Sequence, residues 1–306
     1  MEDPNEINFD NLCLQGGGIK GCAFLGMARA LTELNKLSSI KRFIGSSAGA
    51  IFATGMACCI PVQEMEAIIY STDFTQFMDG NYGQVGQAGR LLYWWGLYNG
   101  DYFYNWFGDI LEKWTGNRDI TFEQIYEKFG KELVITGSNV STKTVHYFTK
   151  DNEPEMSVRL ATRISMSIPI FYVPVYHNDC YWVDGGYLDN YPLAYFDPVP
   201  FFGETIGFKL HTDVSLPSPI NGIADYITNL LETAVEQIEN LRLKPGDELR
   251  TVLIHTFNIK GTDFDISRKD IGRLILSGYK ATMAYFNKWE GIEKNFSELQ
   301  QDFIIL

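Results

Sequence analysis

The segments FDNLCLQGGG (residues 9–18) and IKRFIGSSAG (residues 40–49) each place a short apolar run directly before a glycine-rich turn. Apolar residues at helical spacing follow each turn, over residues 22–34 and again after Gly49. Strand, turn and helix, repeated in this order, are typical of the opening of a parallel α/β sheet. Such sheets bind their ligands where adjacent parallel strands end, so we expect the two turns to lie together.

The second turn, residues 45–49, has the pattern G-x-S-x-G of a nucleophile elbow. In that motif the glycines permit a tight turn that lifts a serine hydroxyl clear of the sheet, and the following helix N-terminus favours negative charge. The pattern predicts Ser47 as a nucleophile for acyl transfer. A plainer alternative is a serine-rich turn in which Ser46 or Ser47 only caps the helix.

The first turn, residues 16–21, reads Gly-Gly-Gly-Ile-Lys-Gly and has two interpretations. Consecutive glycine N–H groups at a helix start form an oxyanion hole where they face a nucleophile. The same string fits the G-x-G-x-x-G pattern of a dinucleotide site, which needs an acidic residue at the end of the second strand. Gly45 and two serines stand there instead, preceded by Lys41 and Arg42, so the oxyanion interpretation is favoured.

A serine nucleophile needs a general base, and the chain offers two kinds. The four histidines lie in no catalytic motif, although His255 follows Asp184 in the order serine, acid, histidine. The α/β-hydrolase fold, which has that order, builds several strands before its elbow, whereas Ser47 comes early in this chain. Asp184 ends a short aromatic strand and is followed by two glycines. Its carboxylate can accept the proton of a nearby serine if burial raises its pKa towards the working pH.

The composition limits the partners and the cofactors. A formal net charge of −13 over 306 residues argues against nucleic acid as a partner and against electrostatic capture by anionic lipids. The five cysteines are odd in number and form no C-x-x-C pair, so we expect free buried thiols in a reducing compartment and no metal site. No linker or repeat interrupts the chain, which favours a single domain over residues 1–306.

No secretory signal or membrane-spanning segment is predicted. Residues 1–6 are acidic and no apolar stretch follows them, which excludes a secretory signal of the usual form. The longest apolar run, residues 48–62, is interrupted by Gly49, Thr54, Gly55 and Pro61 and is too short to span a bilayer. We therefore expect a cytoplasmic protein.

Aromatic residues are concentrated between Tyr93 and Phe107. They form either an apolar lid or membrane-contacting wall that admits an acyl chain, or a side lobe in which they simply pack. Closely spaced glycines predict a loop over residues 79–100. The other predicted elements are helices over residues 102–114, 122–129, 157–167, 223–241 and 271–289, and strands over residues 133–137, 144–149, 181–183, 206–210 and 251–256.

At these motifs the chain resembles the patatin-like phospholipases. That family carries a G-G-G-x-[RK]-G loop, a G-x-S-x-G elbow and a D-G-G motif, and all three occur here in order. Residues 184–192 also match D-G-G-x-x-x-N-x-P, and residues 165–169 are similar to the family's S-x-x-x-P segment. Two departures are Gln15, where many members have aspartate, and Lys20 in place of the commoner arginine.

The resemblance implies a three-layer α/β/α fold with a mostly parallel central sheet. It covers a motif core of about residues 9–195, which residues 196–306 complete with helices and strands. It implies a lipid acyl hydrolase of phospholipase A or lysophospholipase type that works through a Ser47–Asp184 dyad without a cofactor or metal. The implied oxyanion hole consists of N–H groups of Gly16, Gly17, Gly18 and Ala48. The implied motif-supporting residues are Lys20, Gly21, Gly45, Gly49, Gly185, Gly186 and Asn190.

The implied partner is a phospholipid or another acyl lipid, and no nucleic acid. The resemblance leaves open a transient contact with a membrane and an activating protein or small molecule. Two other functions stay open at this point. One is a Ser-His-Asp esterase acting on small soluble esters, and the other is a non-catalytic module that binds a lipid or nucleotide through the glycine loop.

Overall fold

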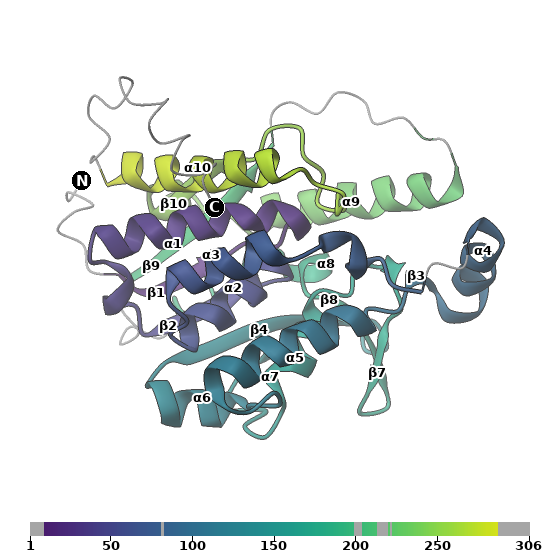
Figure 1. The fold of residues 1–306 in the computed structure, drawn as a ribbon, viewed down its shortest axis with the longest axis horizontal. Helices are drawn as coiled ribbons and strands as arrows, with labels where there is room; N and C mark the ends of the chain where they lie inside the picture. The colour runs from purple at the N-terminus through teal and green to yellow at the C-terminus, as the bar shows by residue number, and fades with distance from the viewer. Residues whose placement is uncertain (1–8, 81–82, 199–203, 213–219, 221, 287–306) are drawn as a thin grey trace.

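In the computed structural model, a central sheet is packed between helices (Figure 1). The structure describes residues 9–80, 83–198, 204–212, 220 and 222–286. The strands run in the order β10-β9-β1-β2-β4-β8-β7, and β5 pairs with β4 outside this path. The pairs from β10 to β4 are parallel, whereas β4 with β5, β4 with β8 and β7 with β8 are antiparallel. The expected mostly parallel sheet is confirmed.

The strands of this sheet are β1 (Phe9–Leu14), β2 (Arg42–Gly45), β4 (Glu132–Asn139), β5 (Thr144–Phe148), β7 (Val175–His177), β8 (Cys180–Asp184), β9 (Glu204–His211) and β10 (Thr251–His255). A separate parallel pair consists of β3 (Gly96–Tyr98) and β6 (Ile170–Tyr172). The α-helices are α1 (Ala23–Glu33), α2 (Ala48–Ala57), α3 (Val62–Ser71), α4 (Gly83–Trp94), α5 (Asp101–Thr115), α6 (Phe122–Phe129), α7 (Val158–Ser165), α8 (Gly186–Asp189), α9 (Ile223–Arg242) and α10 (Arg268–Tyr285). Short 3₁₀ helices are η1 (Gly18–Cys22), η2 (Leu37–Ser39), η3 (Phe74–Phe77) and η5 (Asp247–Arg250).

The buried strands present apolar side chains to both faces of the sheet. In β1, Leu12 and Leu14 belong to the large core, whereas Cys13 between them belongs to a second, smaller one. In β2, Phe43 and Ile44 divide in the same way. Since successive side chains of a strand point to opposite faces, both faces of the sheet must be covered. Helices α1, α2 and α10 pack on the side of the large core. The smaller core on the other side contains residues of the segment after α8, and Leu243, which follows α9, packs against it. The expected three-layer arrangement is confirmed.

The register of β1 and β2 brings the two glycine-rich turns together. Leu14 pairs with Gly45, so both strands leave the sheet at the same level. The Ser46 N–H then donates to the Leu14 carbonyl at 3.3 Å. The first turn continues into η1 and α1, and the second into α2. The expected adjacency of the turns is therefore confirmed.

A helix occupies most of residues 79–100, where the sequence predicted a loop. That prediction was wrong, because a glycine inside a helix costs about 1 kcal/mol but does not forbid the helix. Arg90 fastens the last turn of α4 to β3: its guanidinium donates to the Leu97 carbonyl at 3.1 Å and to the Asn99 side chain. The other predicted elements occur with ends shifted by a few residues. Residues 1–6 and 287–289 lie outside the described residues.

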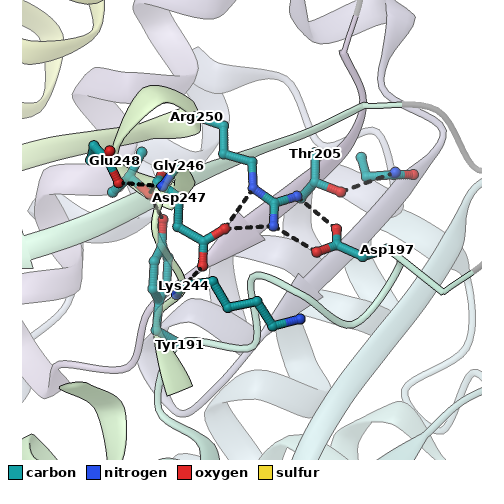
Figure 2. Close-up of polar contacts among 10 residues, drawn as sticks. Tyr191, Asp197, Thr205, Lys244, Gly246, Asp247, Glu248 and Arg250 are labelled. Carbon is teal, nitrogen blue, oxygen red and sulfur yellow. Dashed lines mark hydrogen bonds and ion pairs between the residues drawn. The ribbon is translucent and has the colours of Figure 1, made fainter. Parts of the chain in front are cut away.

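Arg250 connects the C-terminal part of the sheet to the segment that follows α8 (Figure 2). Its guanidinium binds both carboxylate oxygens of Asp197, at 2.6 and 2.7 Å, and Oδ1 of Asp247, at 2.7 and 3.1 Å. The hydrogen bonds to Asp197 raise the pKa of Arg250 above its usual value. Bidentate pairs of this kind fix orientation as well as distance. The start of β10 is thereby held beside the motif-bearing segment.

Two further expectations concern the cysteines and membrane-spanning segments. All five cysteines are free thiols, as expected, and Cys13, Cys22 and Cys58 are buried. Cys59 is exposed and Cys180 is partly exposed, so the expectation of buried thiols was wrong for these two. In the part of the chain that the structure describes, no helix combines the length and the apolar character that crossing a bilayer requires.

Candidate active site

Ser47 stands between β2 and α2 in a backbone conformation that residues other than glycine rarely adopt. Its φ is 51° and its ψ is −123°. Such a conformation costs on the order of 1–3 kcal/mol and persists only where its surroundings enforce it. Here the Ser47 N–H donates to the Ser165 hydroxyl at 2.9 Å, and a Cβ on Gly49 would lie 2.3 Å from the Leu14 carbonyl oxygen. The turn is therefore clamped between α7 and β1, the geometry of a nucleophile elbow.

The neighbouring Ser46 has a structural role. Its hydroxyl is fully buried, lies 2.6 Å from the Thr136 hydroxyl and donates to the Asp189 carbonyl at 2.6 Å. These contacts tie the turn to β4 and α8. The side chain of Ser47, by contrast, lines a cavity. The structure thus separates the two serines that the sequence left as alternatives.

Asp184 lies at the end of β8 and is almost completely buried, with 6% of its surface exposed. Its N–H donates to the Ser167 carbonyl at 2.8 Å, and its Oδ1 accepts the Gly186 N–H at 2.7 Å. Burial raises the pKa of the Asp184 carboxyl from 3.8 to about 7, and this rise outweighs the lowering by the Ser47 hydroxyl and the Gly186 N–H. Oδ2 makes no hydrogen bond within ordinary distance and angle limits. Because the Ser47 hydroxyl lowers this pKa, it lies near the carboxyl, although no fully aligned hydrogen bond joins the two side chains.

The glycine loop presents backbone N–H groups beside Ser47. Gly18 has a φ of 56°, in the left-handed region, and a Cβ there would meet the Gly261 carbonyl at 2.0 Å. Gly18 and Ala48 line the same cavity as Ser47. Within the described residues, the N–H groups of Gly17, Gly18 and Ala48 donate no hydrogen bond to another residue. These three groups are therefore available to an oxyanion.

Gly16 corrects one expectation about this loop. Its N–H donates to the Asn190 carbonyl at 3.0 Å, so it is not available to an oxyanion in this conformation. Gly16 instead attaches the loop to the end of α8. The remaining motif glycines are close-packed, since an added Cβ would lie within 3 Å of a neighbouring residue: Gly21 against Ala48, Gly45 against Gly49, Gly185 against Thr136 and Gly186 against Asn190.

Glu239 of α9 lies next to the glycine loop and contacts residues from separate parts of the chain. It is 7% exposed and forms an ion pair with Lys209 at 2.6 Å. It also accepts hydrogen bonds from the Gln15 amide at 2.6 Å and the Asn190 amide at 3.1 Å. Gln15 in turn accepts the Leu210 N–H at 2.6 Å. Gln15, which departs from the family's aspartate, is thus paired with a carboxylate from elsewhere in the chain.

The same helix also reaches α8. Arg242 forms an ion pair with Asp189 at 3.1 Å, and the Tyr147 hydroxyl donates to that carboxylate at 2.6 Å. Lys20 lies in the same loop, and burial lowers its pKa below the usual value despite the opposing effect of Glu232, Glu239 and Asp263. The C-terminal part of the chain therefore supports both the loop and the segment after Asp184.

An apolar cavity leads to Ser47. The empty space within it, including its opening to solvent, is about 530 Å³. Its walls come from η1, α2, α3, η3 and α5 and from residues 166–172 and 264. Apart from Ser47, nearly all lining side chains are apolar or aromatic. They are Ile19, Cys22, Ala48, Ile51, Phe52, Ile69, Phe74, Phe77, Trp106, Met166, Ile168, Tyr172 and Phe264.

None of the four histidines lines this cavity. His255 ends β10, which is three strand steps from β2, or about 14 Å at roughly 4.8 Å per step. Its ring lies 5.2 Å from the ring of Phe257 and 6.1 Å from that of His211. The structure therefore does not bring a histidine to Ser47.

Sequence reasoning missed Glu239, Gly261 and Phe264. Phe264 lines the cavity and packs against Phe77 and Phe171 at 6.0 and 5.5 Å between ring centres. These residues lie in the C-terminal third, outside every motif, and more than 190 residues separate each from the loop or elbow. No local pattern in the sequence marks them.

With this geometry established, comparisons with known proteins give a consistent result. A family model described as patatin-like phospholipase matches residues 12–197. Protein R571 of Acanthamoeba polyphaga mimivirus is 30% identical over 235 residues, which cover 74% of this chain and 76% of that protein. The probable lipid hydrolase 463L of Invertebrate iridescent virus 6 is 27% identical over 189 residues, or 60% of this chain and 62% of that protein.

Solved structures show the same fold. VipD from Legionella pneumophila superimposes with a TM-score of 0.67 at 18% identity, over 92% of this chain and 67% of VipD. ExoU in its heterodimeric complex with SpcU, from Pseudomonas aeruginosa, superimposes with a TM-score of 0.54 at 17% identity. This match covers 92% of this chain but 52% of ExoU, so ExoU is about twice as long as the part compared.

Replacing Asp184 with asparagine is expected to stabilise the protein most at alkaline pH. The folded-state pKa of about 7 exceeds the usual 3.8, so between these values the folded state binds more protons than the unfolded one. Stability is therefore lost as pH rises, and above pH 7 the cost reaches on the order of 2–4 kcal/mol, which Asp184→Asn removes. Urea unfolding at about pH 8.5 and pH 5 measures the gain, which should be smaller at pH 5. A gain that does not change with pH would contradict the raised pKa.

Replacing Glu239 with alanine is expected to destabilise the fold by about 2–4 kcal/mol, because the Lys209 ammonium, the buried Gln15 amide and the partly buried Asn190 amide lose their partner. Glu239→Gln keeps an acceptor and should cost less. Glu236→Ala is the matched control, since Glu236 is exposed on the same helix and should change stability by about 0.5 kcal/mol or less. Equal losses for Glu239→Ala and Glu236→Ala in urea unfolding would show that the buried contacts contribute nothing.

Proposed function

Because this chain belongs to the patatin-like phospholipase family, and is thus a serine ester hydrolase acting on acyl lipids, we propose that it cleaves fatty-acyl esters of phospholipids or lysophospholipids through Ser47 and Asp184. One observation carries this proposal. The apolar cavity is lined by a serine in a strained elbow, and that serine interacts with a buried carboxyl.

The cavity fits an acyl chain better than a small polar ester. Its walls offer hydrocarbon and aromatic side chains on all sides, and each buried methylene of a fatty-acyl chain contributes about 0.8 kcal/mol. With the chain in this cavity, the ester carbonyl would lie at Ser47 and the head group towards the opening. The Gly17, Gly18 and Ala48 N–H groups are the proposed donors to the carbonyl oxygen.

In the first half of the proposed reaction, the Ser47 hydroxyl oxygen attacks the ester carbonyl carbon and its proton passes to the Asp184 carboxylate. The negative charge moves to the carbonyl oxygen, where the loop N–H groups and the N-terminus of α2 stabilise it. The tetrahedral intermediate then collapses and the C–O bond to the leaving alcohol breaks. That alcohol, a lysolipid or glycerol derivative, takes the proton from Asp184.

In the second half, water attacks the acyl carbon and gives a proton to Asp184. Collapse of the second tetrahedral intermediate breaks the bond to the Ser47 oxygen, which recovers the proton, and the fatty acid leaves. A carboxyl with a pKa of about 7 suits both steps, because it accepts and returns a proton near neutral pH at little cost.

We also propose that residues 1–306 act as one domain, because Glu239, Gly261 and Phe264 complete the loop and the cavity that the motif core begins. An activating protein or small molecule stays a prediction for this chain, since the complex with SpcU is a property of ExoU. Transient contact with a membrane follows from a lipid substrate and is part of the proposal.

Ser47→Ala and Asp184→Asn should each lower the hydrolysis of a fluorogenic acyl ester by about a thousandfold or more, because each removes one half of the proton-transfer pair. His255→Asn should retain activity, since His255 lies about three strand spacings away. Circular dichroism checks that the variants are folded. Full activity of Asp184→Asn, or loss of activity with His255→Asn alone, would favour a histidine-dependent esterase instead.

A further inference from the structure

An aromatic patch is exposed at one end of the molecule. In the last turn of α4 and just after it, Leu92, Tyr93, Trp94 and Trp95 are 75%, 79%, 64% and 52% exposed. The patch continues onto β7 and β8 with Tyr176, which is 60% exposed, and Tyr181, which is 37% exposed. The rings of Trp95 and Tyr181 lie 5.2 Å apart, and those of Tyr176 and Tyr181 lie 4.9 Å apart. We use the term aromatic patch for these six residues.

The aromatic stretch of the sequence therefore divides into two parts. Phe103 and Phe107 of α5 are buried, as a packed side lobe requires, and Trp106 lines the cavity. The residues from Tyr93 to Trp95 are not packed in this way. Figure 1 shows α4 standing away from the body of the molecule, at the end where β3 and β7 also lie.

The patch is linked to the wall of the cavity through two strands. β3 follows α4 directly and pairs with β6, with Tyr98 opposite Tyr172. Tyr172 lines the cavity, and the Tyr98 ring lies 4.7 Å from that of Phe171. On the other side of the patch, Tyr181 belongs to β8, the strand that ends in Asp184. Two strands thus connect the exposed aromatic residues to the two sides of the site.

The chemistry of the patch fits the surface of a phospholipid bilayer. Tryptophan and tyrosine are enriched at the interface between a membrane and water. There the ring lies among apolar groups while its polar N–H or O–H group stays hydrated. Large exposed apolar patches on a soluble protein commonly mark a contact surface. The patch has no charged side chain, and the nearby Arg90 donates to the Leu97 carbonyl and the Asn99 side chain. With a net charge of −13, attraction to anionic lipid is disfavoured.

We propose that the aromatic patch docks the protein on a zwitterionic phospholipid surface and places the cavity next to its lipid substrate. This inference rests on the proposed function, because it takes the acyl lipid as the substrate of the Ser47 site. It assigns binding to residues outside the cavity. Binding to the surface and chemistry at Ser47 are therefore separable by mutation.

The test compares two matched double variants, each made in a Ser47→Ala background so that hydrolysis cannot alter the vesicles. Tyr93→Ser/Trp94→Ser removes two side chains of the patch. Tyr126→Ser/Leu249→Ser removes two exposed apolar side chains from α6 and η5, elsewhere on the molecule. Flotation with phosphatidylcholine vesicles measures binding. The patch variant should bind about tenfold more weakly or worse, whereas the control should stay within about twofold of its parent.

Vesicles of phosphatidylserine should bind the parent protein no better than phosphatidylcholine does. The patch variant with Ser47 intact should hydrolyse a short soluble ester at the same rate as the unmodified protein, but vesicle phospholipid more slowly. Equal vesicle binding by the patch and control variants would overturn the inference. So would a parent protein that ignores vesicles and forms a dimer that the patch variant loses, since the patch would then be a contact between copies. A protein with Ser47 intact that binds vesicles but hydrolyses no ester would instead contradict the proposed function.

Discussion

The burial of the Asp184 carboxyl beside Ser47 is the constraint on which the rest of the site depends. Excluding water raises the pKa of this carboxyl to about 7, whereas an exposed aspartate would stay too weak a base to take a serine proton. Burial also has a cost, because the ionised form needed for the reaction is the form that the protein interior disfavours. β8, Ser167 and Gly186 hold the carboxyl in place against that cost. The buried carboxyl thus lowers the stability of the fold at the position where the proposed chemistry needs a raised pKa.

The elbow and the glycine loop are precise because distant segments clamp them. The strained backbone of Ser47 is fixed by α7 and by β1, and the loop is fixed by Asn190, Glu239 and Gly261. Donors that are already oriented stabilise an oxyanion without reorganisation during the reaction. The family model ends at residue 197, yet two of these three clamps come from beyond it. The C-terminal third therefore supports the candidate active site, although its sequence carries no motif.

The sequence was sufficient where the information is local. A strand before each turn, the pattern around Ser47 and the glycines after Asp184 predicted the sheet edge and the residues that meet there. It was insufficient where tertiary contacts decide. The glycines of α4 suggested a loop, but Arg90 secures the helix to β3. Gly16 matched the oxyanion motif, but Asn190 takes its N–H. Glu239 and Phe264 reach the site only through the packing of α9 and the segment before α10, which no spacing within the motifs encodes.

The rate at which a fluorophosphonate modifies Ser47, followed as a function of pH, tests the central claim most directly. This rate reports the base that activates the serine, independently of which lipid is the natural substrate. We expect this rate to rise with pH with a midpoint of about 7, the pKa of the Asp184 carboxyl, and we expect Asp184→Asn to abolish the rise. A midpoint near the 3.8 of an ordinary aspartate, or an unchanged profile in Asp184→Asn, would contradict it.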